Sequence, residues 1–149
     1  MKLSWEIVTV RTKHPFIIAR GGSSEWRVVW VTVADENGDQ GWGEAAPSRF
    51  YGETADTVVA ALQRYAPVLE DMDPWALESI ETELARTLRF NASARTGISA
   101  ALHDLAAKRV GVPLWKMWGL GPRSAPKSSF TIGIPEDMDT YALVPLGYP

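Results

Sequence analysis

Hydrophobic and polar positions alternate at the start of the chain. Leu3, Trp5 and Ile7 fall on one side of an extended segment, and the residues between them are polar. Because successive side chains of a strand point to opposite faces, this pattern predicts a strand over residues 3–11 with one face in water. Residues 14–24 have no settled period and end in glycines and serines, so a long flexible loop is expected there.

Two more strands are predicted before the first helix. Residues 26–34 are rich in valine and tryptophan, and the Asn37-Gly38 pair that follows them suits a tight hairpin turn. Residues 40–46 then form the returning strand. Three antiparallel strands are stable on their own only when another layer covers one face, so the rest of the chain is expected to supply helices.

The segment that joins the strands to the helices, residues 41–54, has an unusual composition. Gly41 and Gly43 lie in extended sequence, where glycine usually marks a bulge or the close approach of another backbone. Pro47 cannot donate to a ladder and is expected to end the strand. Residues 48–53 combine an arginine, two aromatic residues, a glycine and a carboxylate. Binding loops often have this composition, although an ordinary strand-to-helix connection would also fit.

Helical spacing begins after Thr54, which is a suitable N-cap. Apolar residues recur every three or four positions from there to Leu69, which predicts a first helix. Asp73-Pro74 is a typical helix start and predicts a second helix. Residues 92–110 predict a third helix that is rich in alanine and serine, so a neighbouring element can pack closely against it.

After the third helix the pattern is broken. Gly111 is expected to end that helix, and residues 113–118 predict a short helical piece. Residues 127–134 return to strand character. Residues 139–149 look like an unfinished element, because proline and glycine interrupt them.

Composition places the chain among ordinary globular proteins. It has 149 residues, of which 46% are hydrophobic and 22% charged, and this predicts one compact unit. The net charge of −3 and the scattered basic residues indicate no nucleic-acid partner and no membrane partner. The absence of cysteine excludes a disulfide scaffold, a thiolate nucleophile and a cysteine-type zinc site. Polar residues interrupt the amino-terminal segment, so no signal peptide is predicted and a cytoplasmic location is expected.

Candidates for chemistry are few. Glu44, Glu53, His103 and Asp104 are the obvious ligating side chains, but they make no recognisable metal spacing. His103, in the middle of an alanine-rich helix, is expected to be a hydrogen-bonded packing residue. Glu44 is expected to anchor the following loop through backbone hydrogen bonds. No phosphate-cradling glycine pattern and no nucleophile elbow is present, so the residues alone predict an α+β domain with a loop-built binding surface and no catalytic set.

Several motifs, taken in order, resemble a known family. HPFIIARG at residues 14–21, GWGEAAP at 41–47 and YGET at 51–54 resemble the capping domain of the enolase superfamily, in its mandelate racemase and muconate-lactonizing group. LHDLAAK at 102–108 is similar to the family's long helix, and SFTIGI at 129–134 is similar to its first barrel strand. Within the group the chain looks most like the L-Ala-D/L-Glu dipeptide epimerases.

This resemblance implies an α+β cap over residues 1–125, in which a three-stranded antiparallel sheet is followed by a helical bundle. Residues 126–149 would begin a (β/α) barrel. In the family, one lysine removes the proton next to a carboxylate, another delivers a proton to the opposite face, and Mg2+ stabilises the enolate. The resemblance assigns binding of the small-molecule dipeptide substrate to Phe16, Arg20, Tyr51 and Thr131.

The catalytic part of the barrel is expected to lie outside the chain, because a barrel needs about 200 residues or more and few residues follow its first strand. We therefore expect the N-terminal part of a Mg2+-dependent epimerase that lacks the catalytic lysines and the metal ligands and is inactive alone. A homo-oligomer is an option for the full-length form. The alternatives are the cap of o-succinylbenzoate synthase or of a muconate cycloisomerase, and a stand-alone binding or assembly module or remnant.

Overall fold

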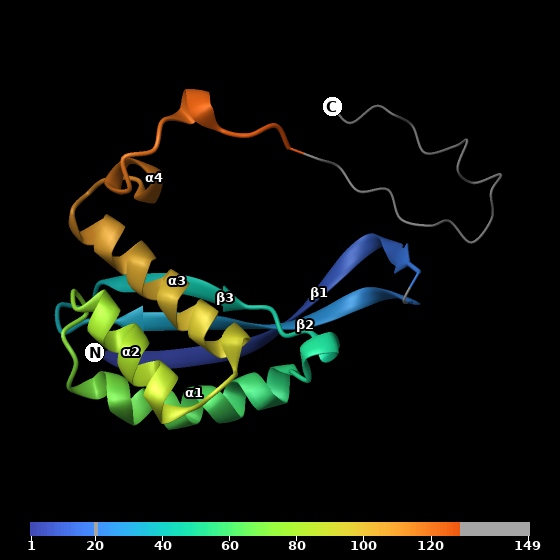
Figure 1. Cartoon of the computed structure of the whole chain (residues 1–149), viewed down its shortest axis with the longest axis horizontal. Helices are drawn as coiled ribbons and strands as arrows, with labels where there is room; N and C mark the ends of the chain where they lie inside the picture. The colour runs from blue at the N-terminus through green and yellow to red at the C-terminus, as the bar shows by residue number, and fades with distance from the viewer. Residues whose placement is uncertain (20, 129–149) are drawn as a thin grey trace. The chain divides into compact units, whose positions relative to one another are not determined.

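The computed structural model describes residues 1–19 and 21–128. These residues divide between two compact units, each of which is described by itself. The first unit comprises Met1–Thr9 and Arg27–Ala125, and it contains the long helices and the part of the sheet that lies within these ranges. The described residues of the second unit are residues 10–19, 21–26 and 126–128. Figure 1 follows the chain from the strands into the helices.

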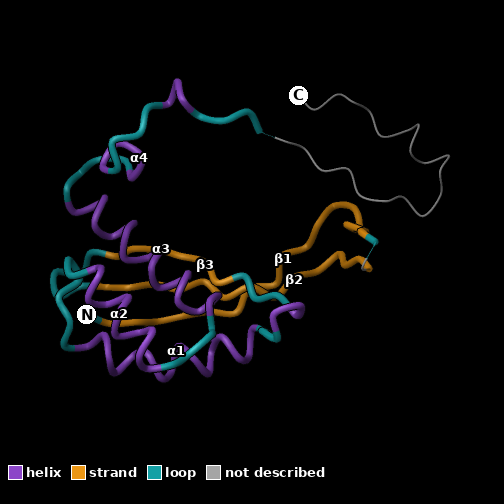
Figure 2. The backbone as a smooth tube through the Cα atoms, viewed as in Figure 1, coloured by secondary structure: helices purple, strands orange, loops and turns teal. Residues whose placement is uncertain are grey.

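The sheet has three strands in the order β1, β2, β3, which confirms the predicted topology. β1 spans Lys2–Ile18, β2 spans Gly21–Ala34 and β3 spans Gln40–Ala45. β2 and β3 pair antiparallel, with Val29 opposite Ala45 and Val33 opposite Gly41. β1 and β2 are neighbours joined by only two residues, so they also run antiparallel (Figure 2).

The long flexible loop expected over residues 14–24 is wrong. β1 continues to Ile18, and β2 already begins at Gly21, so both strands extend into a hairpin. Backbone pairing between two strands does not require a side-chain period, and a cross-strand ion pair between Arg11 and Glu25 (2.6 Å) adds to it. No described side chain of residues 10–26 is buried, so this part of the two strands has no buried face that alternation in the sequence could reveal.

The turn between β2 and β3 lies where the Asn-Gly pair predicted it. Gly38 adopts the left-handed conformation with φ of 87°, which suits glycine. The turn is wider than two residues, because the N–H of Asp35 donates to the carbonyl of Asp39 (3.0 Å). One Asp35 carboxylate oxygen accepts from the N–H groups of Asn37 (2.8 Å) and Asp39 (3.0 Å), so this side chain organises the turn.

The helices follow the apolar stripes of the sequence. Two short 3-10 turns, η1 (Arg49–Tyr51) and η2 (Pro122–Ser124), accompany α1 (Ala55–Glu70), α2 (Leu77–Thr87), α3 (Ala92–Arg109) and α4 (Leu114–Met117). Thr54 caps α1 as predicted. Its hydroxyl accepts from the N–H of Thr57 (3.2 Å), and the hydroxyl of Thr57 accepts from the N–H of Thr54 (2.9 Å).

The start of α2 differs from the prediction. Asp73-Pro74 does not open the helix, which begins at Leu77. The side chain of Asp73 instead accepts from the N–H of Trp75 (2.9 Å), and its carbonyl accepts from the N–H of Ala76 (3.0 Å). An Asp side chain that bonds its own backbone two residues on favours a turn over a first helical turn.

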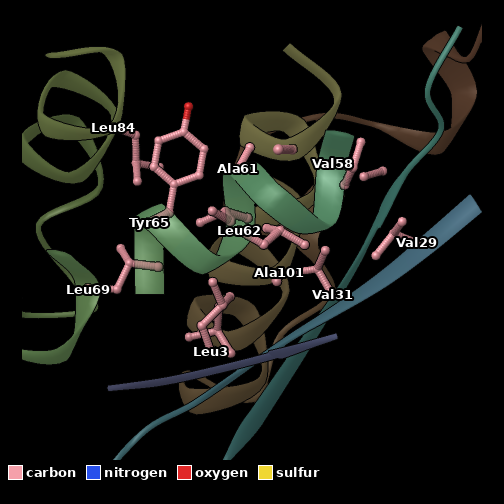
Figure 3. Close-up of a cluster of buried hydrophobic side chains, with 14 of the residues drawn as sticks. Leu3, Val29, Val31, Val58, Ala61, Leu62, Tyr65, Leu69, Leu84 and Ala101 are labelled. Carbon is pink, nitrogen blue, oxygen red and sulfur yellow. The ribbon is translucent and has the colours of Figure 1, made fainter. Parts of the chain in front are cut away.

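One face of the sheet is buried against the helices. Val29, Val31 and Val33 of β2 are fully buried, whereas Trp30 between them is 43% exposed. Figure 3 shows Val29 and Val31 facing the side chains of α1 and α3. The helices contribute the other main core residues, which are Ala55, Val58, Ala61, Leu62, Tyr65, Leu69, Ile80, Leu84, Ala94, Ile98, Ala101, Leu102 and Leu105.

α3 packs directly on β3, and glycine makes this contact possible. A Cβ added to Gly41 would overlap the carbonyl oxygen of Ala101 and lie 2.6 Å from the N atom of Leu105. A Cβ added to Gly43 would overlap the carbonyl oxygen of Gly97. The predicted close approach at these two glycines is therefore confirmed, with the alanine-rich helix as the approaching backbone.

The predicted strand over residues 127–134 falls mostly beyond the described part. Residues 127 and 128 belong to no regular element. Residues 129–149, which include Thr131 and the unfinished element expected at 139–149, lie outside the described residues.

Candidate functional site

The loop between β3 and α1 presents an aromatic side chain to solvent. It contains η1, whose N-cap Ser48 accepts from the N–H of Phe50 (3.4 Å). Gly52 closes the turn in the left-handed conformation with φ of 73°, and its N–H donates to the carbonyl of Arg49 (3.1 Å). Tyr51 at the end of η1 is 84% exposed. The backbone of the loop is thus ordered by its own bonds while Tyr51 stays available for contact.

A cavity of about 570 Å³ lies beside this loop. It separates the β3–α1 loop from the junction of α2 and α3. Its lining residues are Glu44, Ala46, Ser48, Tyr51, Glu53, Phe90, Asn91, Ala92, Ser93 and Thr96. We call this space the Tyr51 cavity.

The junction of α2 and α3 on the other side of the Tyr51 cavity has an unusual backbone. Phe90 and Asn91 both have positive φ, at 62° and 50°, and Phe90 is 87% exposed. A bulky residue rarely adopts this conformation, and strain of this kind is concentrated at functional sites. Two exposed aromatic residues, Tyr51 and Phe90, therefore flank the same cavity.

A carboxylate ties the two sides of the Tyr51 cavity together. Glu53 accepts from the N–H of Ser93 through Oε1 (3.2 Å) and from the Ser93 hydroxyl through Oε2 (2.6 Å). The Ser93 hydroxyl also lies 3.3 Å from the carbonyl oxygen of Ala46. The loop anchor found here is Glu53, whereas Glu44 was expected to play this part. Glu53 and Ser93 are 40 positions apart in the sequence, so no local sequence pattern indicates the pair.

One of the core residues of α1 is a tyrosine. Tyr65 of α1 is fully buried, and Figure 3 shows its hydroxyl at the margin of the apolar cluster. Burial raises the pKa of the Tyr65 hydroxyl, Arg95 opposes this effect, and the negative charge of Glu53 adds to it. In the described part of the chain, Tyr65 Oη and Arg95 Nε are buried without a hydrogen-bond partner.

The four predicted substrate-binding residues are distributed as follows. Phe16 lies in the outer part of β1, within the second unit, and is half-buried. Tyr51 lies in the first unit beside its cavity. Arg20 and Thr131 are outside the described residues.

His103 and Asp104 have structural partners. His103 Nδ1 lies 2.8 Å from the carbonyl oxygen of Ser99, and its ring meets Trp118 edge-on with centroids 5.4 Å apart, which confirms the predicted packing role. Asp104 accepts from the N–H of Trp42 (2.8 Å) and from Nζ of Lys108 (2.6 Å). The carboxy-terminal part of α3 is thereby bonded to β3.

The described residues do not supply a metal site. Among residues 1–19 and 21–128, no three side chains of His, Cys, Asp or Glu come together as a ligand set. No helix in the described part of the chain is long and apolar enough to cross a bilayer.

Comparison with known proteins places these features in a family. Residues 2–119 match the model of the mandelate racemase / muconate lactonizing enzyme N-terminal domain. The chain belongs to this family. The L-Ala-D/L-Glu epimerase of Bacteroides thetaiotaomicron is 31% identical over 134 residues, which cover 90% of this chain and 34% of the epimerase.

Solved structures of this family share the fold. The dipeptide epimerase from Cytophaga hutchinsonii, complexed with Mg and the dipeptide D-Ala-L-Val, matches with a TM-score of 0.84 and 26% identity over 90% of this chain and 37% of that one. The 2-chloromuconate cycloisomerase from Rhodococcus opacus matches with a TM-score of 0.75 and 25% identity over 80% of this chain and 33% of that one. The chain thus spans about a third of the length of the relatives it matches.

Proposed function

We propose that this chain supplies the substrate-facing cap of a dipeptide epimerase. The observation that carries the proposal is the similarity, over 90% of the chain, both to an L-Ala-D/L-Glu epimerase and to a dipeptide epimerase that holds Mg and a dipeptide. The Tyr51 cavity agrees with it, since exposed aromatic side chains on an ordered loop suit contact with a small ligand.

The proposed division of labour assigns binding to this chain. Residues 1–125 form the cap and residues 126–149 begin the barrel. Phe16, Arg20, Tyr51 and Thr131 contact the dipeptide and help to select it. The proposal assigns the proton-transferring lysines and the metal ligands to the barrel of the longer enzyme, and it is supported by the lack of a cluster of three His, Cys, Asp or Glu side chains among residues 1–19 and 21–128.

The chemistry of the whole enzyme would be removal and return of the proton next to a carboxylate. Mg2+, when bound in such an enzyme, stabilises the negative charge of the enolate. The contribution of the cap is to bind the dipeptide, orient it and exclude water. A cytoplasmic location, and a homo-oligomeric full-length form, complete the proposal.

The test begins with the coding DNA beyond the codon for Pro149. The expected result is a frame that continues into a strand with a Lys-x-Lys motif, which would carry a proton-transferring lysine. Spaced acidic residues should follow as metal ligands. The product of that frame should exchange the α-proton of Ala-Glu for deuterium in the presence of Mg2+, whereas the 149-residue chain alone should show none. A stop codon with no barrel gene nearby would favour a stand-alone binding module or remnant.

The similarity to 2-chloromuconate cycloisomerase supports a second candidate, the cap of a cycloisomerase. The protein encoded by the longer frame can be assayed for both activities. A cycloisomerase converts a muconate and leaves the α-proton of a dipeptide in place. Turnover of a muconate without exchange of Ala-Glu would replace the epimerase proposal.

A further inference from the structure

The amino-terminal end of α3 lacks a cap of its own. The first N–H groups of a helix have no partner within the helix, and the N-cap side chain normally accepts from one of them. Asn91 occupies the N-cap position in a left-handed conformation and makes no side-chain cap bond. The first turn of α3 therefore depends on an acceptor from elsewhere in the chain.

Glu53 supplies that acceptor. Ser93 is the second residue of α3, and its N–H donates to Glu53 Oε1 at 3.2 Å. The hydroxyl of Ser93 donates to Oε2 of the same carboxylate at 2.6 Å. A carboxylate at a helix N-terminus is favoured by the helix dipole, and hydrogen bonds to an ionised group are stronger than neutral ones.

The contact between Glu53 and Ser93 also holds both ends of the β3–α1 loop. At one end, the carbonyl of Ala46 lies 3.3 Å from the Ser93 hydroxyl, which is shared between Ala46 and the closer Glu53. At the other end, Glu53 directly precedes Thr54, the N-cap of α1. Between them, the carbonyl of Ser48 accepts from the N–H groups of Tyr51 (3.0 Å) and Glu53 (3.2 Å).

From this arrangement we propose that Ser93 and Glu53 are positioning residues, which hold the β3–α1 loop so that Tyr51 is presented in one fixed conformation before any ligand arrives. The loop is then a preformed wall of the Tyr51 cavity and not a lid that closes over it. We call the contact between Glu53 and Ser93 the brace. The part that Tyr51 plays toward a dipeptide rests on the proposed function, but the brace itself does not.

The brace is tested by amide hydrogen exchange in the full chain, with Ser93→Ala, Ser93→Thr and Glu53→Gln. Loss of the hydroxyl in Ser93→Ala is expected to speed exchange at Tyr51 and Glu53 by about tenfold relative to the buried amides of β2. Ser93→Thr keeps the hydroxyl and should restore slow exchange. Glu53→Gln keeps the shape but loses the charge, and should give an intermediate rate.

A matched control is Ser99→Ala on the same helix. His103 bonds the backbone carbonyl of Ser99, so loss of the Ser99 hydroxyl should leave the loop unchanged. Unchanged loop exchange in Ser93→Ala, or an equal rise in the loop and in β2, would overturn the brace. If Ser93→Ala does not fold, the ratio measured in Glu53→Gln decides in the same way. The proposed function fails separately, by the absence of dipeptide exchange in the longer product.

Discussion

Asp35 shows how one carboxylate can hold together a turn and the end of a helix. One of its oxygens accepts from two N–H groups of the β2–β3 turn, and the other accepts from Nε of Arg109 (2.7 Å) at the end of α3. The side chain of Asp35 is only 1% exposed and that of Arg109 13%. The Arg109 guanidinium also lies over the ring of Trp75, 5.2 Å from its centroid.

The ionisation of Asp35 should make stability depend on pH. Burial raises the pKa of this carboxyl, but the hydrogen bonds from Arg109 and from the backbone of Asp39 and Asn37 outweigh burial and hold it below the ordinary 3.8. A lowered folded pKa stabilises the protein above the unfolded pKa of about 3.9, and this contribution is lost as the pH falls through the folded value.

We predict that Asp35→Asn lowers the melting temperature most at pH 7 and progressively less below about pH 4. Thermal unfolding of both proteins, followed by circular dichroism from pH 7 to pH 2.5, measures the difference. A difference in melting temperature that stays constant over this range would show that the charge of Asp35 is not the stabilising element.

At the residue level the sequence revealed the glycines but not the polar pairs. Gly41 and Gly43 could be recognised because glycine inside a strand usually marks a bulge or the close approach of another backbone. The Asp35–Arg109 pair joins residues 74 positions apart, and no local pattern indicates such a partner. The Glu53–Ser93 contact was not predicted for the same reason, although the YGET motif at residues 51–54 indicated that its loop is a candidate binding loop.

At the level of elements, periodicity succeeded where an apolar stripe is buried against a core. The three long helices follow such stripes, and each was expected close to where it lies. The outer parts of β1 and β2 have no buried stripe, so their pairing could not be recognised. The start of α2 was misplaced because Asp73 caps a turn as readily as a helix.

The contact of α3 with β3 sets the position of the helix layer. The contribution of the close approach at Gly41 to stability can be measured by substitution. Gly41→Ala places a methyl group against the Ala101 carbonyl, and relieving that overlap requires the two backbones to separate. We predict a loss of about 3 kcal/mol or more in the free energy of unfolding, above the usual range for an overpacked core, because backbone must move.

Gly38→Ala is the matched control. A Cβ at Gly38 meets nothing within 4 Å, and only its φ of 87° disfavours alanine. Its cost is expected to be about 1 kcal/mol. Urea unfolding of both variants tests the difference, and equal losses would mean that α3 does not depend on the bare backbone of β3.

For the whole molecule, the important feature is where the buried core of the described residues lies. Every residue of the buried cluster, from Leu3 to Leu105, belongs to the first unit. In the hairpin Val10–Trp26, no residue whose side chain is described is buried, and Arg11 and Glu25 form an exposed ion pair. Exposed pairs of this kind contribute about 1 kcal/mol or less.

The hairpin Val10–Trp26 and the core of the first unit should therefore open independently. Leu62→Ala removes a fully buried side chain and should lower the global free energy of unfolding by about 2–5 kcal/mol. Amide exchange at Val31 should then accelerate by about 30-fold or more, because that amide is released only by global unfolding. Exchange in the hairpin should stay unchanged, since it proceeds by local opening.

Arg11→Ala should have the opposite effect, with faster exchange at residues 21–25 and no change at Val31. An equal acceleration of hairpin and core amides in Leu62→Ala would show that the hairpin folds as one cooperative unit with the core.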